Sequence, residues 1–79
     1  MVAGMRTVEV RGSIRLGQFL KLAGLADDGA LARQLVTEGD VSVNGFPELR
    51  RGHHLQDGDV VEVDAPAGRD GALVRVLPD

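Results

Sequence analysis

The stretch from Glu38 to Val63 reads EGDVSVNGFPELRRGHHLQDGDVVEV and predicts two strand pairs joined by tight turns. Val41 and Val43 alternate with a polar residue, which is the period of a half-buried strand. The dipeptide Asn44-Gly45 that follows favours a type I′ turn, because both central positions of that turn need positive φ. The turn would bring Val43 opposite Phe46 on one face of the hairpin.

The strands beyond this hairpin are marked by a proline and by a second turn. Pro47 cannot donate a ladder hydrogen bond, so the return strand should be short, bulged or at a sheet edge. Asp57-Gly58 predicts another tight turn, and Val60–Val63 a strand after it. The segment Ala65–Gly71 is rich in Pro, Gly and Ala and is expected to be a loop, with a last strand over Ala72–Leu77.

Two apolar stripes with helical spacing precede the hairpin. The first follows Ser13, a candidate N-cap, ends near Gly24 and comprises Leu16, Phe19, Leu20 and Ala23. The second follows the candidate cap Asp27-Asp28, ends at Gly39 and comprises Leu31 or Ala32, Leu35 and Val36. Each stripe would bury one face of a helix, and the short link favours a packed helix pair. Gly17 is unexpected within the first helix, because an interior glycine weakens it.

The order of elements predicts an α+β domain. Before the helices, Thr7, Glu9 and Arg11 alternate with Val8 and Val10, which indicates a short strand. A chain of 79 residues is one domain. We therefore expect a two-helix hairpin packed on a small antiparallel β-sheet. Residues 1–13 would form an N-terminal segment with a short strand, 14–63 the main unit, and 64–79 a loop and C-terminal strand that complete the sheet.

The composition excludes several classes of protein. The chain has no Cys, which rules out disulfide staples, zinc–thiolate sites and Cys nucleophiles. No apolar run approaches the length of a membrane helix, and residues 1–10 lack the apolar stretch of a secretion signal, so a cytoplasmic protein is expected. The net charge is −3, with the acidic excess in residues 55–79. This charge argues against indiscriminate binding of nucleic acid, but it leaves room for one basic face.

Catalytic and metal-binding patterns are weak in this sequence. Ser13 and Ser42 fall at a predicted cap and inside a predicted strand. His53 and His54 are adjacent, so in extended chain they point to opposite faces. Their spacing does not match that of a structural zinc site, and the glycines of residues 66–71 do not follow the pattern of a dinucleotide-binding loop. We expect no enzymatic activity, no metal and no cofactor.

Basic residues form the stronger candidate site. Lys21 and Arg33 lie off the apolar stripes of the predicted helices, and four more basic residues follow the hairpin, namely Arg50, Arg51, His53 and His54. Each of them alone would be an ordinary solvated charge. They form a binding face only if the fold brings them together.

The order and spacing of several segments resemble the S4 RNA-binding domain. The resemblance covers residues 14–63 and rests on IRLGQFLKLAGL, the Ala32-Arg33 step, EGDVSVNG, the Glu48–Arg51 segment and DGDVVEV. It is best to the small free-standing bacterial members of that family. It implies an S4-like (αL) fold and a non-catalytic protein that binds structured RNA, ribosomal or transfer RNA, in ribosome assembly or translation-linked RNA metabolism.

The resemblance also implies which residues contact RNA. In such domains the two helices and the following hairpin form one basic face, so by position Lys21, Arg33, Arg50 and Arg51 would contact phosphates. The residues that would assist them are Arg15 at the start of the first helix, Asn44 at the turn, and His53. Gly17-Gln18 and Asp28-Gly29 stand where many relatives carry charged residues, so fewer cations are available at the helix ends.

The lack of aromatic residues bears on the kind of RNA. Only Phe19 and Phe46 are aromatic, and we expect no exposed aromatic platform for single-stranded bases. We expect the protein to recognise RNA by the shape and backbone of its helices. We also expect a monomer without membrane association, and ribosomal particles are further candidate partners.

Two other functions remain open. The segments VNG, ELRRG and LQDGDVVEV also resemble sulfur-carrier proteins of the ubiquitin-like β-grasp type. Those proteins work through a C-terminal Gly-Gly, whereas this chain ends in Val76-Leu77-Pro78-Asp79. The second alternative is a protein-interaction module that kept the fold and lost RNA binding, which the acidic net charge favours.

Overall fold

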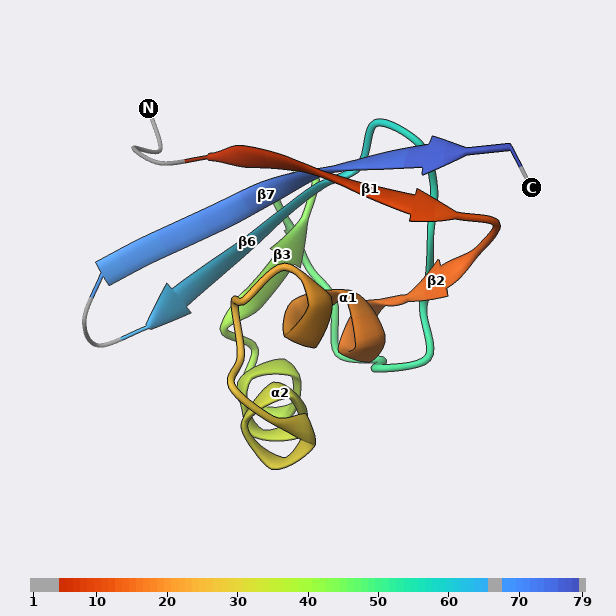
Figure 1. Ribbon diagram of the computed structural model, residues 1–79. Helices are drawn as coiled ribbons and strands as arrows, with labels where there is room; N and C mark the ends of the chain where they lie inside the picture. Colours follow the sequence, from red (N-terminus) through yellow and green to blue (C-terminus); the bar gives the residue numbers. More distant parts are fainter. Residues whose placement is uncertain (1–4, 66–67, 79) are drawn as a thin grey trace.

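The computed structural model describes residues 5–65 and 68–78. The strands and helices follow one another as β1 (Arg6–Arg11), β2 (Ile14–Arg15), α1 (Leu16–Leu22), α2 (Gly29–Thr37), β3 (Val41–Val43), β4 (Phe46–Pro47), β5 (His54–Leu55), β6 (Val60–Ala65) and β7 (Gly68–Leu77). Both helices lie against one face of the sheet and leave the other face uncovered (Figure 1). The α+β class predicted from the sequence is therefore confirmed.

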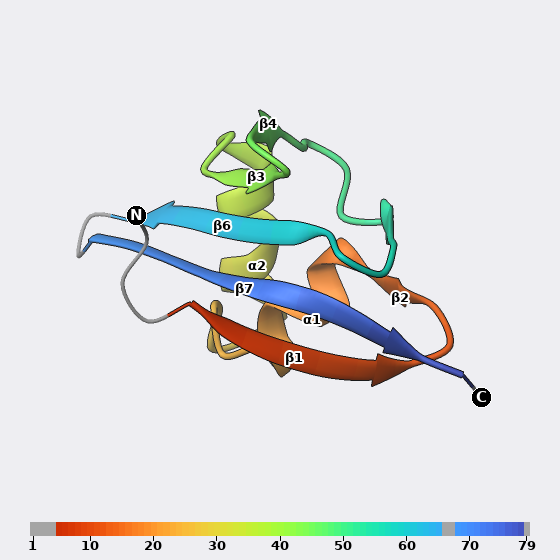
Figure 2. The ribbon, with the colours of Figure 1, turned by 90° about the horizontal axis from the view of Figure 1, so that it is seen from above.

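The main sheet is mixed, not purely antiparallel as expected. Its strands run in the order β1-β7-β6-β3-β4, and β2 and β5 form a separate two-stranded sheet. The contacts of β3 with β4, of β3 with β6 and of β6 with β7 are antiparallel, but β1 pairs with β7 in parallel. Figure 2 shows β1 and β7 side by side along one edge. The first and last strands share no connecting turn, so no local pattern indicates the direction of their pairing.

The segment expected to be a loop over Ala65–Gly71 is mostly strand. β6 continues to Ala65, and β7 begins at Gly68, so the two strands form one long antiparallel ribbon. Residues 66 and 67 lie outside the described part. Gly71 is buried in β7, where a Cβ would stand only 3.0 Å from the Val61 carbonyl oxygen. The glycine that suggested a loop instead permits this close approach of two strands.

The core lies between the inner face of the sheet and the two helices. Its largest fully buried side chains include Phe19, Leu16 and Leu20 from α1, with Val36, Val41, Val61 and Val74 around them. The apolar stripes predicted for the helices are the stripes that become buried. Truncating Phe19 to alanine would cost about 3–5 kcal/mol, because it would leave a cavity at the centre of this small core.

The ends of the helices agree only in part with the sequence-based expectation. The Asp28 side chain accepts the Leu31 N–H over 2.8 Å and caps α2, as predicted. Ser13 does not cap α1, because Ile14 and Arg15 pair with β5 and the helix starts at Leu16. Instead the Gln18 side chain accepts the Arg15 N–H over 3.2 Å. Within the described residues, neither helix has the length and hydropathy needed to cross a bilayer.

Candidate nucleic-acid interface

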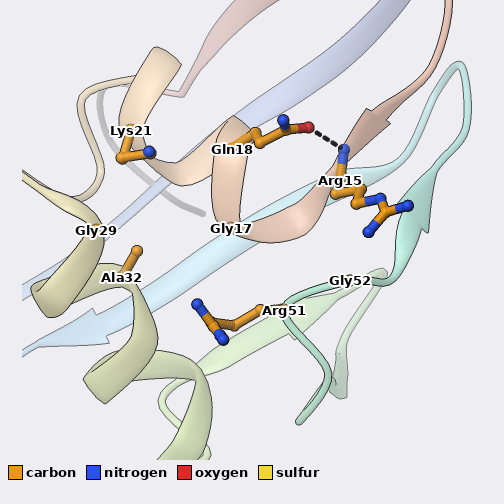
Figure 3. Close-up of a pocket in the computed structure, with 8 residues that line it drawn as sticks. All are labelled: Arg15, Gly17, Gln18, Lys21, Gly29, Ala32, Arg51 and Gly52. Carbon is orange, nitrogen blue, oxygen red and sulfur yellow. Dashed lines mark hydrogen bonds between the residues drawn. The ribbon is translucent and has the colours of Figure 1, made fainter.

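A hollow of about 340 Å³, which we call the cationic hollow, opens between the helices and the segment that follows the hairpin. Figure 3 shows its lining, which comprises Arg15, Gly17, Gln18, Lys21, Gly29, Ala32, Arg51 and Gly52. Three of these residues are basic and come from three different segments. The others are small, except for Gln18, so they leave space between the three cations.

Backbone hydrogen bonds place Arg51 beside α1. The Gly17 N–H donates to the Arg51 carbonyl oxygen over 3.0 Å, and the Leu16 N–H donates to the His53 carbonyl oxygen over 2.8 Å. These are first-turn N–H groups, which have no partner inside the helix. The segment after the hairpin, which turns at Arg51 and Gly52, therefore caps α1 with its carbonyl groups. This contact carries Arg51 to the same hollow as Lys21.

Gly17 leaves space in the hollow beside this contact, although the contact itself does not require a glycine. A Cβ at this position would stand 3.5 Å from Arg51 Cβ and 3.6 Å from the Arg51 carbonyl oxygen. These are ordinary contact distances, and Gly17 has no positive φ, so the glycine is not required by the backbone. What the missing side chain provides is space in the hollow.

The three cations of the hollow have no ion-pair partner among residues 5–65 and 68–78. The ion pairs found there join Arg6 to Asp70, and Glu48 to both Arg50 and His53. Three like charges around one hollow repel each other, and an anion between them would relieve this repulsion. Gly29 is the first residue of α2, so the positive end of that helix also lies at the rim, although its Asp28 cap is itself acidic.

Arg50 lies in a different environment from Arg51. Its Nε donates to Glu48 Oε2 over 3.3 Å, and His53 Nδ1 lies 3.1 Å from Glu48 Oε1. Burial raises the pKa of Glu48, but the hydrogen bonds from the Arg50 backbone and side chain and the charge of His53 outweigh it and hold the pKa below its usual value. Glu48 thus offsets the charge of Arg50 and also engages His53, and the sequence placed both residues in the binding set.

The remaining candidates lie outside the cationic hollow. Arg33 is exposed and does not line the hollow, but it follows Gly29 by one helical turn and so lies next to the rim on α2. Asn44 and His53 line a second hollow instead. The Asn44 amide is already engaged, because its Nδ2 donates to Asp59 Oδ1 over 3.0 Å and its Oδ1 accepts the Val60 N–H over 2.9 Å. With φ of 54°, Asn44 forms the left-handed turn that the Asn-Gly dipeptide predicted.

Of the predicted residues, the structure therefore gathers Arg15, Lys21 and Arg51 around one hollow. Sequence reasoning missed the small residues that form its walls, notably Gly29, Ala32 and Gly52. One signal was available. Gly17 is a glycine inside a helical stripe, and such a residue often marks a close approach or a site.

Comparison with known proteins identifies the family. A sequence model described as "S4 domain" matches residues 8–69, which is most of the chain, and the chain therefore belongs to the S4 domain family. A curated relative is the "Probable ribosome maturation protein RlbA" of Bacillus subtilis (strain 168), which is 49% identical over 51 residues. The aligned part covers 65% of this chain and 72% of that protein. The family indicated by the sequence is confirmed.

Proposed function

We propose that this protein is a non-catalytic RNA-binding domain that acts in ribosome maturation and holds RNA phosphates in the cationic hollow. The observation that carries the proposal is that Arg15, Lys21 and Arg51, from three different segments, line one hollow. Membership of the S4 domain family and the name of the relative support it. The bound molecule would be structured RNA, most directly ribosomal RNA, with transfer RNA as the second candidate.

The chemistry of the three cations suits a phosphate backbone. Arginine can hold two phosphate oxygens with its planar fork, and lysine provides a compact point charge. Two arginines and one lysine around an open hollow can neutralise neighbouring phosphates of one strand or of two strands across a groove. This mode reads the shape of RNA more than its sequence.

The net charge of −3 is compatible with this proposal because the charges are separated. Val61 and Val63 of β6 are buried against the core, so the alternating Glu62 and Asp64 lie on the face of the sheet away from the helices. The cationic hollow is on the helix side. An RNA would therefore approach with its phosphates toward the helices and away from these carboxylates.

We further propose that the protein binds as a monomer in the cytoplasm, with Arg33, Arg50 and His53 as flanking contacts. Their positions around the hollow allow them to meet a longer RNA, but the pairing with Glu48 weakens the contributions of Arg50 and His53. Asn44 would contribute to RNA binding indirectly, by stabilising the hairpin.

The test is RNA binding by fluorescence anisotropy at low salt, with a labelled RNA stem and with ribosomal RNA. Arg51→Ala and Lys21→Ala should each weaken binding about 10-fold or more, because each removes a charge-assisted contact. Arg75→Ala is the matched control. Arg75 is exposed in β7 next to the buried Val74, so the variant loses the same charge from the opposite face of the sheet.

Two results would contradict the proposal. Failure of the wild type to bind either RNA at low salt would favour the protein-interaction module. An Arg75→Ala variant that loses as much affinity as Arg51→Ala would show that only total charge matters, and not the hollow.

A further inference from the structure

Phe46 is the most exposed large apolar side chain of the described residues, at 76%. The expectation that no aromatic side chain is exposed is therefore wrong. Phe46 follows the type I′ turn of Asn44 and Gly45 and belongs to β4, a two-residue strand at the sheet edge. Its backbone is fixed by pairing with Val43, so the ring is presented from a defined position.

Phe46 lies on the side of the sheet that carries the cationic hollow. Opposite residues of an antiparallel pair share a face, and its partner Val43 is buried in the core under the helices. Phe46 escapes burial because β4 is the edge strand beyond β3 (Figure 2). An RNA bound on the helix side would therefore meet this ring.

The ring borders a second hollow, of about 380 Å³, which we call the Phe46 hollow. Its volume is in the range of small-ligand clefts. Its other lining residues are Val43 and Pro47, the carboxylates Glu48 and Asp59, and the polar side chains of Asn44, His53, His54 and Gln56. Both carboxylates are already engaged, Glu48 by Arg50 and His53 and Asp59 by Asn44. An exposed aromatic face beside hydrogen-bonding groups is the combination that receives an unpaired nucleobase.

The two hollows adjoin each other. Arg15 lines the cationic hollow and His54 lines the Phe46 hollow, and these residues are direct partners in the β2–β5 ladder. The segment from Glu48 to His54 also contributes to both, with Arg51 on one side and His53 on the other. A strand whose phosphates lie at Arg15 and Arg51 can thus place a neighbouring base at Phe46.

The surroundings of Phe46 favour a base over a protein partner. An aromatic anchor of a protein interface is normally enclosed by apolar contacts that exclude water. The other exposed apolar residue of this segment is Leu49, whose Cδ2 lies beside Gly39 at the end of α2 and not in the Phe46 hollow. Two apolar residues, Val43 and Pro47, also line the Phe46 hollow, but Val43 is buried in the core and the six remaining residues are polar or charged.

We propose that Phe46 stacks on one unpaired base of the bound RNA, so that the preferred target is a stem with a bulged or looped-out nucleotide. This inference rests on the proposed function. It specifies, in addition, the kind of RNA structure that the protein selects.

The test compares two RNA stems that differ only in one bulged nucleotide, a fluorescent adenine analogue. Phe46→Leu keeps an apolar side chain but has no aromatic face, and Phe46→Trp keeps the stacking surface. Wild type should bind the bulged stem roughly 5- to 150-fold more tightly than the paired stem, the range that one stacked base provides. Binding should also change the fluorescence of the analogue. Phe46→Trp should retain this preference and Phe46→Leu should lose it, while Leu49→Ala is the matched control and should match the wild type.

The possible failures are distinguishable. If wild type binds both stems and Phe46→Leu binds the bulged stem as tightly as wild type does, stacking is refuted and the cationic hollow stands. If wild type binds neither stem, the proposed function fails and this inference falls with it. Unchanged RNA binding by Phe46→Leu, combined with loss of a protein from affinity-purified ribosomal particles, would assign Phe46 to a protein contact and overturn stacking.

Discussion

The Gly17 N–H donates to the Arg51 carbonyl oxygen over 3.0 Å, and this hydrogen bond joins the first turn of α1 to the segment after the hairpin. It satisfies a helix N–H that would otherwise lack a partner, and it holds the arginine at the cationic hollow. Stability and the proposed binding site therefore depend on the same contact.

Gly17→Ala should separate the effect on stability from the effect on RNA binding. The added methyl group meets only ordinary contacts with Arg51, at 3.5 Å or more, and alanine is the better helix former. We expect the free energy of unfolding to rise by about 0.5–1 kcal/mol, while the methyl group narrows the hollow and weakens RNA binding. Urea denaturation and anisotropy measure the two effects. A less stable variant would mean that the Arg51 segment cannot tolerate any side chain there.

Arg50→Ala and Arg51→Ala remove the same charge from neighbouring positions, but their effects should differ. Arg50 is engaged by Glu48, whereas Arg51 lines the hollow. With three phosphates neutralised, the slope of log affinity against log salt should be about −2 to −3 for the wild type. Arg51→Ala should reduce its magnitude by about 0.7–1, and Arg50→Ala by less. Equal slopes for the two variants would contradict the inference that Arg51 contacts RNA phosphates more directly than Arg50 does.

Asn44 variants should lose stability and keep RNA affinity. Asn44→Ala removes the hydrogen bonds with Asp59 and Val60 and places alanine at φ of 54°, at a combined cost of about 1–3 kcal/mol. Asn44→Gly loses the same hydrogen bonds but accepts this φ, so it should be less destabilising. Thermal unfolding measures the stability of the wild type, Asn44→Gly and Asn44→Ala, which should decrease in that order. A large loss of RNA affinity in a folded Asn44→Gly protein would support the direct contact expected from the sequence.

Glu48 should contribute to the acid dependence of stability. Because its pKa is lowered in the folded protein, its contribution is complete above the ordinary carboxyl pKa of about 4.3 and is lost as the pH falls through the lower folded value. Glu48→Gln should therefore be less stable than the wild type near neutral pH, and this difference should shrink below about pH 4. Urea unfolding across this range measures it. A difference that is independent of pH would exclude a role for the Glu48 charge.

The features predictable from the sequence are the local ones. The turn at Asn44-Gly45 and the cap at Asp28 each depend on a few adjacent residues, and both form as expected. The buried stripes of the helices were also predictable, because helical spacing alone decides which face is apolar.

The features that were missed depend on distant pairing. The Ser13 cap failed because Arg15 pairs with His54, far along the chain. The edge position of β4 was predictable from Pro47, but the exposure of Phe46 was not, because it depends on how far the helices extend over that edge. For the same reason the two adjacent arginines looked equivalent in the sequence, although only Arg51 reaches the cationic hollow.

The parallel pairing of β1 with β7 has a consequence for how the chain folds during synthesis. Among the described strands, β7 is the sole neighbour of β1. During synthesis β1 therefore cannot pair with its neighbour until β7 has also left the ribosome. Until Gly68–Leu77 has been made, β1 keeps an unsatisfied backbone edge and Val10 lacks its cover. A nascent chain that stops at residue 63 would contain every basic side chain of the cationic hollow and the hydrogen bonds between α1 and the Arg51 segment, but its sheet would lack β7 and would leave β1 unpaired.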